Sequence, residues 1–214
     1  MGSKIVRGLL VVVVLAITAN ADVIVSQTGN FSQDDDQQIF NFSLSASSDV
    51  TFQALSFAGG TNANGQAIAE GGFAPVLTLF DSTGSELGYD AGGIAPGGCG
   101  LRNIDSATGF CLDAYMNLNL GAGGYFLVLT EYDNFAIGPN YSDGFFYDGS
   151  GNFTDIGTGP FYLNAGSGYQ RTSAWAVDIT APSMSPVPEP SSLRLLLPAL
   201  VIGCIAVAVQ KQRS

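Results

Sequence analysis

Short strand-like stretches, some alternating between apolar and polar residues and some largely apolar, dominate the middle of the chain and are separated by glycine-rich turns. They run from Phe40 to Ala46, Val50 to Phe57, Pro75 to Phe80, Met116 to Leu120, Tyr125 to Thr130 and Trp175 to Ile179. A period of two is typical of strands with one buried face, and the 28 glycines suit turns better than helices. Residues 22–180 are therefore predicted to form one all-β domain, an antiparallel β-sandwich or jelly roll, with Leu127 and Trp175 in its core.

The N-terminus has the three parts of a secretory signal peptide. Lys4 and Arg7 make a positive region, Leu9 to Ile17 an apolar stretch, and Ala19 and Ala21 a small-residue cleavage pattern. We expect residues 1–21 to be removed on export. A membrane helix is the alternative, but the apolar stretch is short for one.

The C-terminus combines a short motif, a hydrophobic stretch and a basic end. Residues 181–190 form a proline-rich linker that ends in Pro188-Glu189-Pro190. Residues 191–214 contain a 15-residue apolar run, Leu195 to Val209, and then Lys211 and Arg213. Because a stable span needs about 20 apolar residues, this segment suits transient insertion better than permanent anchoring, although an ordinary anchor remains the alternative.

This C-terminal arrangement resembles the PEP-CTERM sorting signal. The resemblance implies recognition at Pro188, Glu189 and Pro190 by a processing enzyme of the exosortase type. It also implies delivery to the cell surface or extracellular matrix, in association with exopolysaccharide.

The exported part is strongly acidic. Residues 22–185 contain 17 Asp or Glu, two basic residues (Arg102 and Arg171) and no Lys or His, so their net charge is −15. Phosphate backbones would be repelled, which argues against nucleic-acid binding. Calcium, which prefers oxygen ligands, would be attracted.

Cys99 and Cys111 are the two cysteines of the exported part. In an oxidising compartment they are expected to form a disulfide that closes a short loop. A metal site is the alternative, but two cysteines without histidine make a poor zinc set.

The missing residue types restrict the possible catalytic chemistry. Without histidine there is no Ser-His-Asp triad, and without lysine in the exported part there is no Schiff base or P-loop. Paired carboxylates, as in glycoside hydrolases, remain possible, and Glu131 with Asp133 is the nearest candidate pair. Acidic domains offer such pairs by chance, so we expect no enzyme and assign no catalytic residue.

Two groups of residues are candidate binding sites. Carboxylates near strand ends could bind Ca²⁺, or could instead be solvated loop charges that protect sheet edges; they are Asp34, Asp35, Asp36, Asp81, Asp90, Asp133, Asp143 and Asp148. Ten aromatics lie between residues 132 and 169. They could stack on sugars or fill a core beneath a long loop, and both interpretations stay open.

Three stretches resemble the pattern of bacterial pre-peptidase C-terminal domains. They are residues 34–44, residues 75–84, which include Leu79-Phe80-Asp81, and the Gly-rich turn and strand at residues 121–130. An uncharacterised family of exported PEP-CTERM proteins is closer still, through residues 129–135 and 171–178. The resemblance implies a jelly-roll β-sandwich, in some relatives with Ca²⁺ or glycan binding, and establishes no activity.

Together these features predict an exported, non-enzymatic matrix or surface protein associated with exopolysaccharide. A Ca²⁺-dependent carbohydrate-binding module is the first alternative, and a carboxylate-based glycoside hydrolase is the second.

Overall fold

Two four-stranded antiparallel sheets face each other in the computed structural model of the chain, which describes residues 21–93, 98–163 and 168–182. The predicted all-β sandwich is therefore confirmed. Residues 1–20 of the predicted signal peptide lie outside the described residues, as does everything after Pro182, which includes the predicted sorting motif and hydrophobic segment. Within the described residues, no helix is long and apolar enough to cross a membrane.

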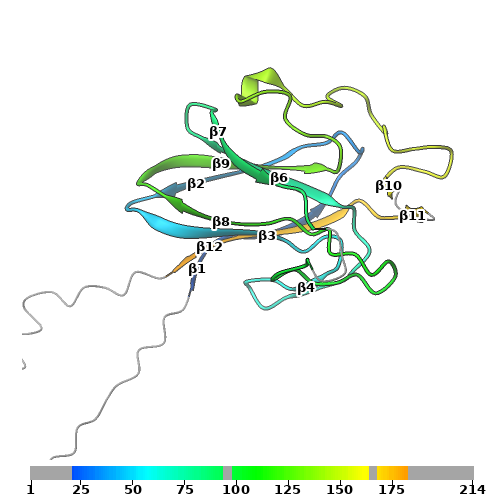
Figure 1. The fold of residues 1–214 in the computed structure, drawn as a ribbon, viewed down its shortest axis with the longest axis horizontal. Coiled ribbons are helices and arrows are strands. Elements are labelled where there is room, and N and C mark those ends of the chain that lie inside the picture. The colour runs from blue at the N-terminus through cyan, green and yellow to red at the C-terminus, as the bar shows by residue number, and fades with distance from the viewer. Residues whose placement is uncertain (1–20, 94–97, 164–167, 183–214) are drawn as a thin grey trace, which may run out of the picture. The chain divides into compact units, whose positions relative to one another are not determined.

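The first sheet has the strand order β1-β12-β3-β8. Its strands are β1 (Ala21–Asn30), β12 (Ala174–Pro182), β3 (Ser48–Ala54) and β8 (Tyr115–Leu120). Strands β1 and β12 pair along their whole length, from Ala21 opposite Pro182 to Asn30 opposite Ala174. The first and last strands of the domain are thus neighbours, and the chain enters and leaves at the same end of this sheet (Figure 1).

The second sheet has the strand order β2-β9-β6-β7. Its strands are β2 (Gln38–Leu44), β9 (Gly123–Glu131), β6 (Pro75–Asp81) and β7 (Glu86–Asp90). Two short pairs complete the fold: β4 (Gly60–Thr61) with β5 (Ala67–Ile68), and β10 (Tyr162–Leu163) with β11 (Tyr169–Gln170). A single 3₁₀ turn, η1 (Tyr141–Asp143), lies in the segment between β9 and β10.

The main core lies between the sheets and is rich in aromatic residues. Leu127 is fully buried and Trp175 is 7% exposed, which confirms both predictions. The Trp175 ring meets Phe40 edge-on at 5.7 Å and Phe31 at 6.4 Å between centroids. Edge-on and tilted contacts of this kind are favoured by the aromatic quadrupole.

A second apolar cluster covers the outer face of the β2-β9-β6-β7 sheet. Residues 75–80 of β6 are all buried, so this strand has no solvent-exposed face. Phe80 and Val128 pack beneath Phe145 of the segment between β9 and β10, which passes over this sheet in Figure 1. In the sequence, a strand that is buried on both faces is a nearly continuous apolar run, and Pro75 to Phe80 has this pattern.

The six predicted strands are all present, with shifted ends. The prediction of Val50 to Phe57 was too long, because β3 ends at Ala54. After that residue the buried Asp113 carboxylate accepts the backbone N–H groups of Phe57 and Ala58, and the chain bends. Strands β1 and β7 were not predicted.

Candidate functional site

A pocket of about 820 Å³ opens near the end of the sandwich where β9 and β7 finish. Its walls come from the end of β7, the loop before β8, the end of β9, the long β9–β10 segment and β10. The sixteen residues that line it are Tyr89, Asp90, Ala91, Gly92, Phe110, Leu112, Glu131, Tyr132, Asp133, Phe135, Tyr147, Phe153, Thr154, Ile156, Tyr162 and Leu163. Its size lies within the usual range for small-molecule sites.

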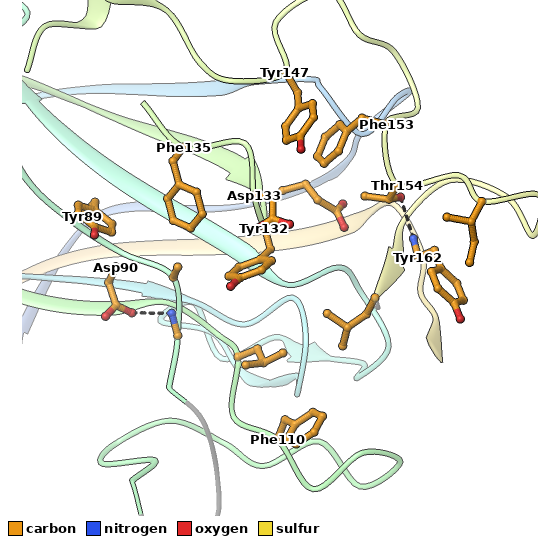
Figure 2. Close-up of a pocket in the computed structure, with 16 residues that line it drawn as sticks. Tyr89, Asp90, Phe110, Tyr132, Asp133, Phe135, Tyr147, Phe153, Thr154 and Tyr162 are labelled. Carbon is orange, nitrogen blue, oxygen red and sulfur yellow. Dashed lines mark hydrogen bonds between the residues drawn. The ribbon is translucent and has the colours of Figure 1, made fainter. Parts of the chain in front are cut away.

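Seven aromatic side chains line this pocket. Phe135 meets Tyr89 and Tyr132 edge-on, at centroid distances of 5.9 and 5.6 Å. Tyr147 and Phe153 stack in parallel at 4.0 Å, and Figure 2 shows this pair on the opposite side of the view from Phe110. Tyr132 is 42% exposed and Tyr89 is 60% exposed, so both can contact a ligand.

The aromatics of residues 132–169 therefore divide between the two interpretations that the sequence left open. Phe145 and Phe161 are buried core residues. Tyr132, Phe135 and Tyr147 line the pocket instead. The same segment thus builds a core and a concave aromatic surface.

Asp34 holds the long β9–β10 segment in place, although the two are far apart in the sequence. Its Oδ2 accepts the Thr154 N–H at 2.9 Å and its Oδ1 accepts the Phe161 N–H at 2.9 Å. Asp34 itself is fully buried. Because Thr154 lines the pocket and its hydroxyl accepts the Tyr162 N–H at 2.9 Å (Figure 2), Asp34 fixes this wall.

The opposite wall is tied by the disulfide and an ion pair. Cys99 and Cys111 are bonded, with their Cα atoms 5.6 Å apart, which confirms the predicted disulfide. Phe110 and Leu112, the neighbours of Cys111, both line the pocket. From within the closed loop, Arg102 donates to both carboxylate oxygens of Asp90 at 2.8 and 2.7 Å.

Glu131 is the buried acid of the pocket. It is 3% exposed, and its Oε2 has no hydrogen-bond partner among the described residues. Burial, and secondarily the charge of Asp34, raise the pKa of Glu131 well above its usual range. A lone buried carboxylate is costly when ionised, so in the empty pocket Glu131 is expected to hold a proton.

Asp133 reaches the pocket from a turn and not from strand β9. The strand ends at Glu131, and Asp133 occupies a turn with a positive φ of 74°. This conformation is unusual for a residue with a side chain. Both acids of the predicted pair line the same pocket, Glu131 from the end of β9 and Asp133 from the turn that follows.

The eight predicted calcium ligands serve mainly as acceptors for nearby backbone N–H groups. Asp35 accepts from Gly151, Asp36 from Gln33, Asp81 from Thr83, Asp143 from Asn140 and Asp148 from Phe145, each within 2.8 to 3.0 Å. The described ranges contain no group of three or more His, Cys, Asp or Glu that could hold a metal ion. These carboxylates therefore order the loops around them, a role that neither of the two predicted alternatives included, and a Ca²⁺ site remains a prediction.

A smaller hollow of about 290 Å³ adjoins the first. It is lined by Thr78, Glu86, Tyr89, Phe135, Ala136 and Phe146. Tyr89 and Phe135 line both hollows, so their edge-on contact stands between the two. A ligand that extends through both hollows would contact the Tyr89–Phe135 pair on both sides.

Several pocket residues were not predicted from sequence. Tyr89, Phe110 and Leu112 lie outside the aromatic-rich segment and come close to it only in the fold. The one usable signal for Phe110 and Leu112 was their position beside Cys111, since a disulfide orders its neighbours. Nothing in the residues around Tyr89 distinguishes it from an ordinary exposed strand residue.

No protein-family model matches the chain, and it has no match among curated proteins. Among solved structures, it is similar to the pre-peptidase C-terminal domain of collagenase from Bacillus anthracis. That similarity has 11% sequence identity and a TM-score of 0.35, and covers 73% of this chain and 89% of that one. It is a structural resemblance at low identity, and it says nothing about ligand or activity.

Proposed function

We propose that the chain is an exported, non-enzymatic protein of the cell surface or extracellular matrix that binds a saccharide in its aromatic pocket. The observation that carries this proposal is the lining of the pocket by seven aromatic side chains together with Glu131, Asp133 and Thr154. Flat aromatic faces pack on sugar rings, and a few polar groups then orient the hydroxyls.

The position of the pocket supports a role at a surface. Strands β1 and β12 bring the two ends of the domain together at Ala21 and Pro182. Asp34, which fixes the pocket wall, follows the other end of β1, a ten-residue strand that spans about 33 Å. A tether that follows Pro182 would therefore join the domain at the end of β1 and β12 opposite Asp34.

Export and sorting are part of the same proposal. The Cys99–Cys111 disulfide suits an oxidising compartment. We propose that residues 1–21 are cleaved on export, and that an exosortase-type enzyme processes the chain at Pro188, Glu189 and Pro190 after transient insertion of residues 191–214. The domain would then join exopolysaccharide outside the cell.

Glycan binding is tested directly with an oligosaccharide panel and the purified full-length chain. Tyr132→Ala and Phe135→Ala should each weaken binding of any panel ligand by about tenfold or more, because aromatic contacts contribute roughly 1 kcal/mol or more beyond simple burial. Leu101→Ala is the matched control, since Leu101 is 74% exposed and lies outside the pocket. A panel without any ligand would refute the proposal.

Sorting is tested by replacing Pro188, Glu189 and Pro190 together with Ala. Export should continue while release fails, so full-length protein should accumulate in the membrane fraction. Pro182 and Pro186, replaced in the same way, provide the control. Normal processing of the triple variant would show that the tail is an ordinary anchor.

A carboxylate-based glycoside hydrolase is the second candidate, because Glu131 and Asp133 line one open pocket. A buried, protonated carboxylic acid beside a second acid is the arrangement that a glycosidase uses. Release of new reducing ends from a bound glycan, abolished by Glu131→Gln, would favour it. Binding without turnover would favour the binding protein.

A further inference from the structure

The aromatic pocket is lined by acidic side chains and by no basic ones. Among the sixteen lining residues there are three acids, Asp90, Glu131 and Asp133, and no Lys or Arg. The charge of Asp90 is neutralised by Arg102, which is not part of the pocket lining, with 2.7 Å between Nη2 and Oδ2. The described structure gives Glu131 and Asp133 no basic partner of this kind, since its ion pairs involve Asp90 and Asp105.

Glu131 is the most informative of these acids. Its Oε2 is buried and has no hydrogen-bond donor among the described residues, although most buried carboxylate oxygens in proteins are satisfied. The fully buried Asp34 lies close enough to oppose its ionisation. A positive charge placed in the pocket would favour the ionised form of the Glu131 carboxyl group and offset the repulsion from Asp34 at the same time.

The aromatic walls favour the same kind of ligand. Phe135 contacts both Tyr89 and Tyr132 edge-on in the wall of the pocket. The face of an aromatic ring is electronegative and attracts an organic cation within about 6 Å. Aromatic faces beside unpaired carboxylates therefore favour a ligand whose own ring carries an ammonium group.

Two other charged ligands fit less well. A bare divalent cation needs six or more oxygen ligands, and the described residues contain no cluster of three or more acids able to hold one. An acidic polysaccharide would be repelled by the pocket and by the net charge of −15 over residues 22–185.

We infer that the pocket selects a saccharide that carries a free, positively charged amine, with the ammonium placed between the Glu131 carboxylate and the aromatic side chains. This inference rests on the proposed saccharide-binding function and narrows it to amino sugars without N-acylation. Asp133, exposed at the pocket, adds long-range attraction for the same charge.

The test compares two hexasaccharides that share ring, linkage and length and differ at the nitrogen, which is a free, cationic amine in hexameric glucosamine and a neutral acetamide in hexameric N-acetylglucosamine. Calorimetry on the full-length chain in detergent, at about pH 6 where amines are protonated, should show binding of the glucosamine hexamer at least about tenfold tighter. Glu131→Gln, which keeps the shape but cannot ionise, should abolish most of this preference. Asp49→Asn, the same kind of carboxylate-to-amide change at an exposed residue of β3 outside the pocket, should leave it intact.

Each other outcome has a definite meaning. Equal affinity for the two hexamers, or a preference that survives Glu131→Gln, overturns the amine inference and leaves saccharide binding standing. Binding of neither hexamer, when the panel yields a neutral ligand, overturns it as well. If no glycan binds at all, the proposed function fails. A third probe, hexalysine, would overturn the saccharide assignment if it bound this pocket more tightly than the glucosamine hexamer.

Discussion

The guanidinium of Arg171 donates to the carboxylate of Asp105 at 2.9 Å, with the two side chains only 5% and 1% exposed. The same guanidinium donates to the backbone oxygens of Gly72 and Phe57, at 3.1 and 2.9 Å, and lies 3.9 Å from the centre of the Phe57 ring. Burial acts to raise the pKa of Asp105, but hydrogen bonds from Arg171 and Thr108 and the Arg171 charge together lower it. One arginine therefore joins three loops at one end of the sandwich.

Replacing Arg171 with Ala should lower the free energy of unfolding by about 3–5 kcal/mol, because Asp105 would be left as an unpaired buried charge. Urea denaturation of the exported domain measures the loss. Arg102→Ala is the matched control and should cost less, since its pair with Asp90 is 15% and 23% exposed. Equal losses in the two variants would show that burial is not the deciding factor.

Gly29 provides a prediction about strand packing. A Cβ atom at this position would lie 2.3 Å from Cζ2 of Trp175, the residue paired with it across β1 and β12. Gly29→Ala should therefore destabilise the domain by about 1–3 kcal/mol through overpacking. At Gly121 a Cβ would meet nothing closer than 3.9 Å, so Gly121→Ala should stay within about 0.5 kcal/mol. Thermal melts of the two variants provide the comparison, and similar melting temperatures would contradict it.

Asp113 should make the stability depend on pH. Burial raises its pKa from 3.8 to about 7, despite hydrogen bonds from the Ala58 and Phe57 N–H groups. The folded state then holds the proton more tightly than the unfolded state, so the contribution is complete below about pH 4 and is lost as the pH rises to about 7. Asp113→Asn should flatten this fall by up to about 4 kcal/mol. Parallel pH profiles for the variant and the wild type would contradict the shift.

The disulfide should affect both stability and binding. Replacing Cys99 and Cys111 with Ser should cost about 3 kcal/mol, because the bond closes a loop between residues 12 apart. Phe110 and Leu112 flank Cys111 in the pocket wall, so glycan affinity should also fall. Addition of reductant to the wild type should reproduce both losses. Unchanged affinity in a folded double variant would show that the disulfide-closed loop does not contribute to glycan binding.

The fold class followed from local patterns. Alternation in Phe40 to Ala46 predicted β2, and the short, largely apolar runs Tyr125 to Thr130 and Pro75 to Phe80 predicted β9 and β6, because the apolar pattern of a strand reports which of its faces are buried. Strand β1 was missed because its polar second half, Ser26 to Asn30, hides the alternation and a register shift lies between Val23 and Val25. Strand β7 is short and contains Gly88, which weakens its pattern.

The sequence by itself determined an acidic, disulfide-bonded β domain, since charge, cysteine spacing and periodicity are all local properties. Only the tertiary structure decided which residues form a site. Tyr89, Phe110 and Tyr132 meet in one pocket, and Arg171 reaches Asp105 across 66 positions of sequence. Such long-range proximity depends on how sheets and loops pack to bury the whole apolar surface at once, which no short stretch of sequence encodes. The same packing leaves Glu131 buried without a partner, and that free carboxylate gives the pocket its predicted preference for a cation.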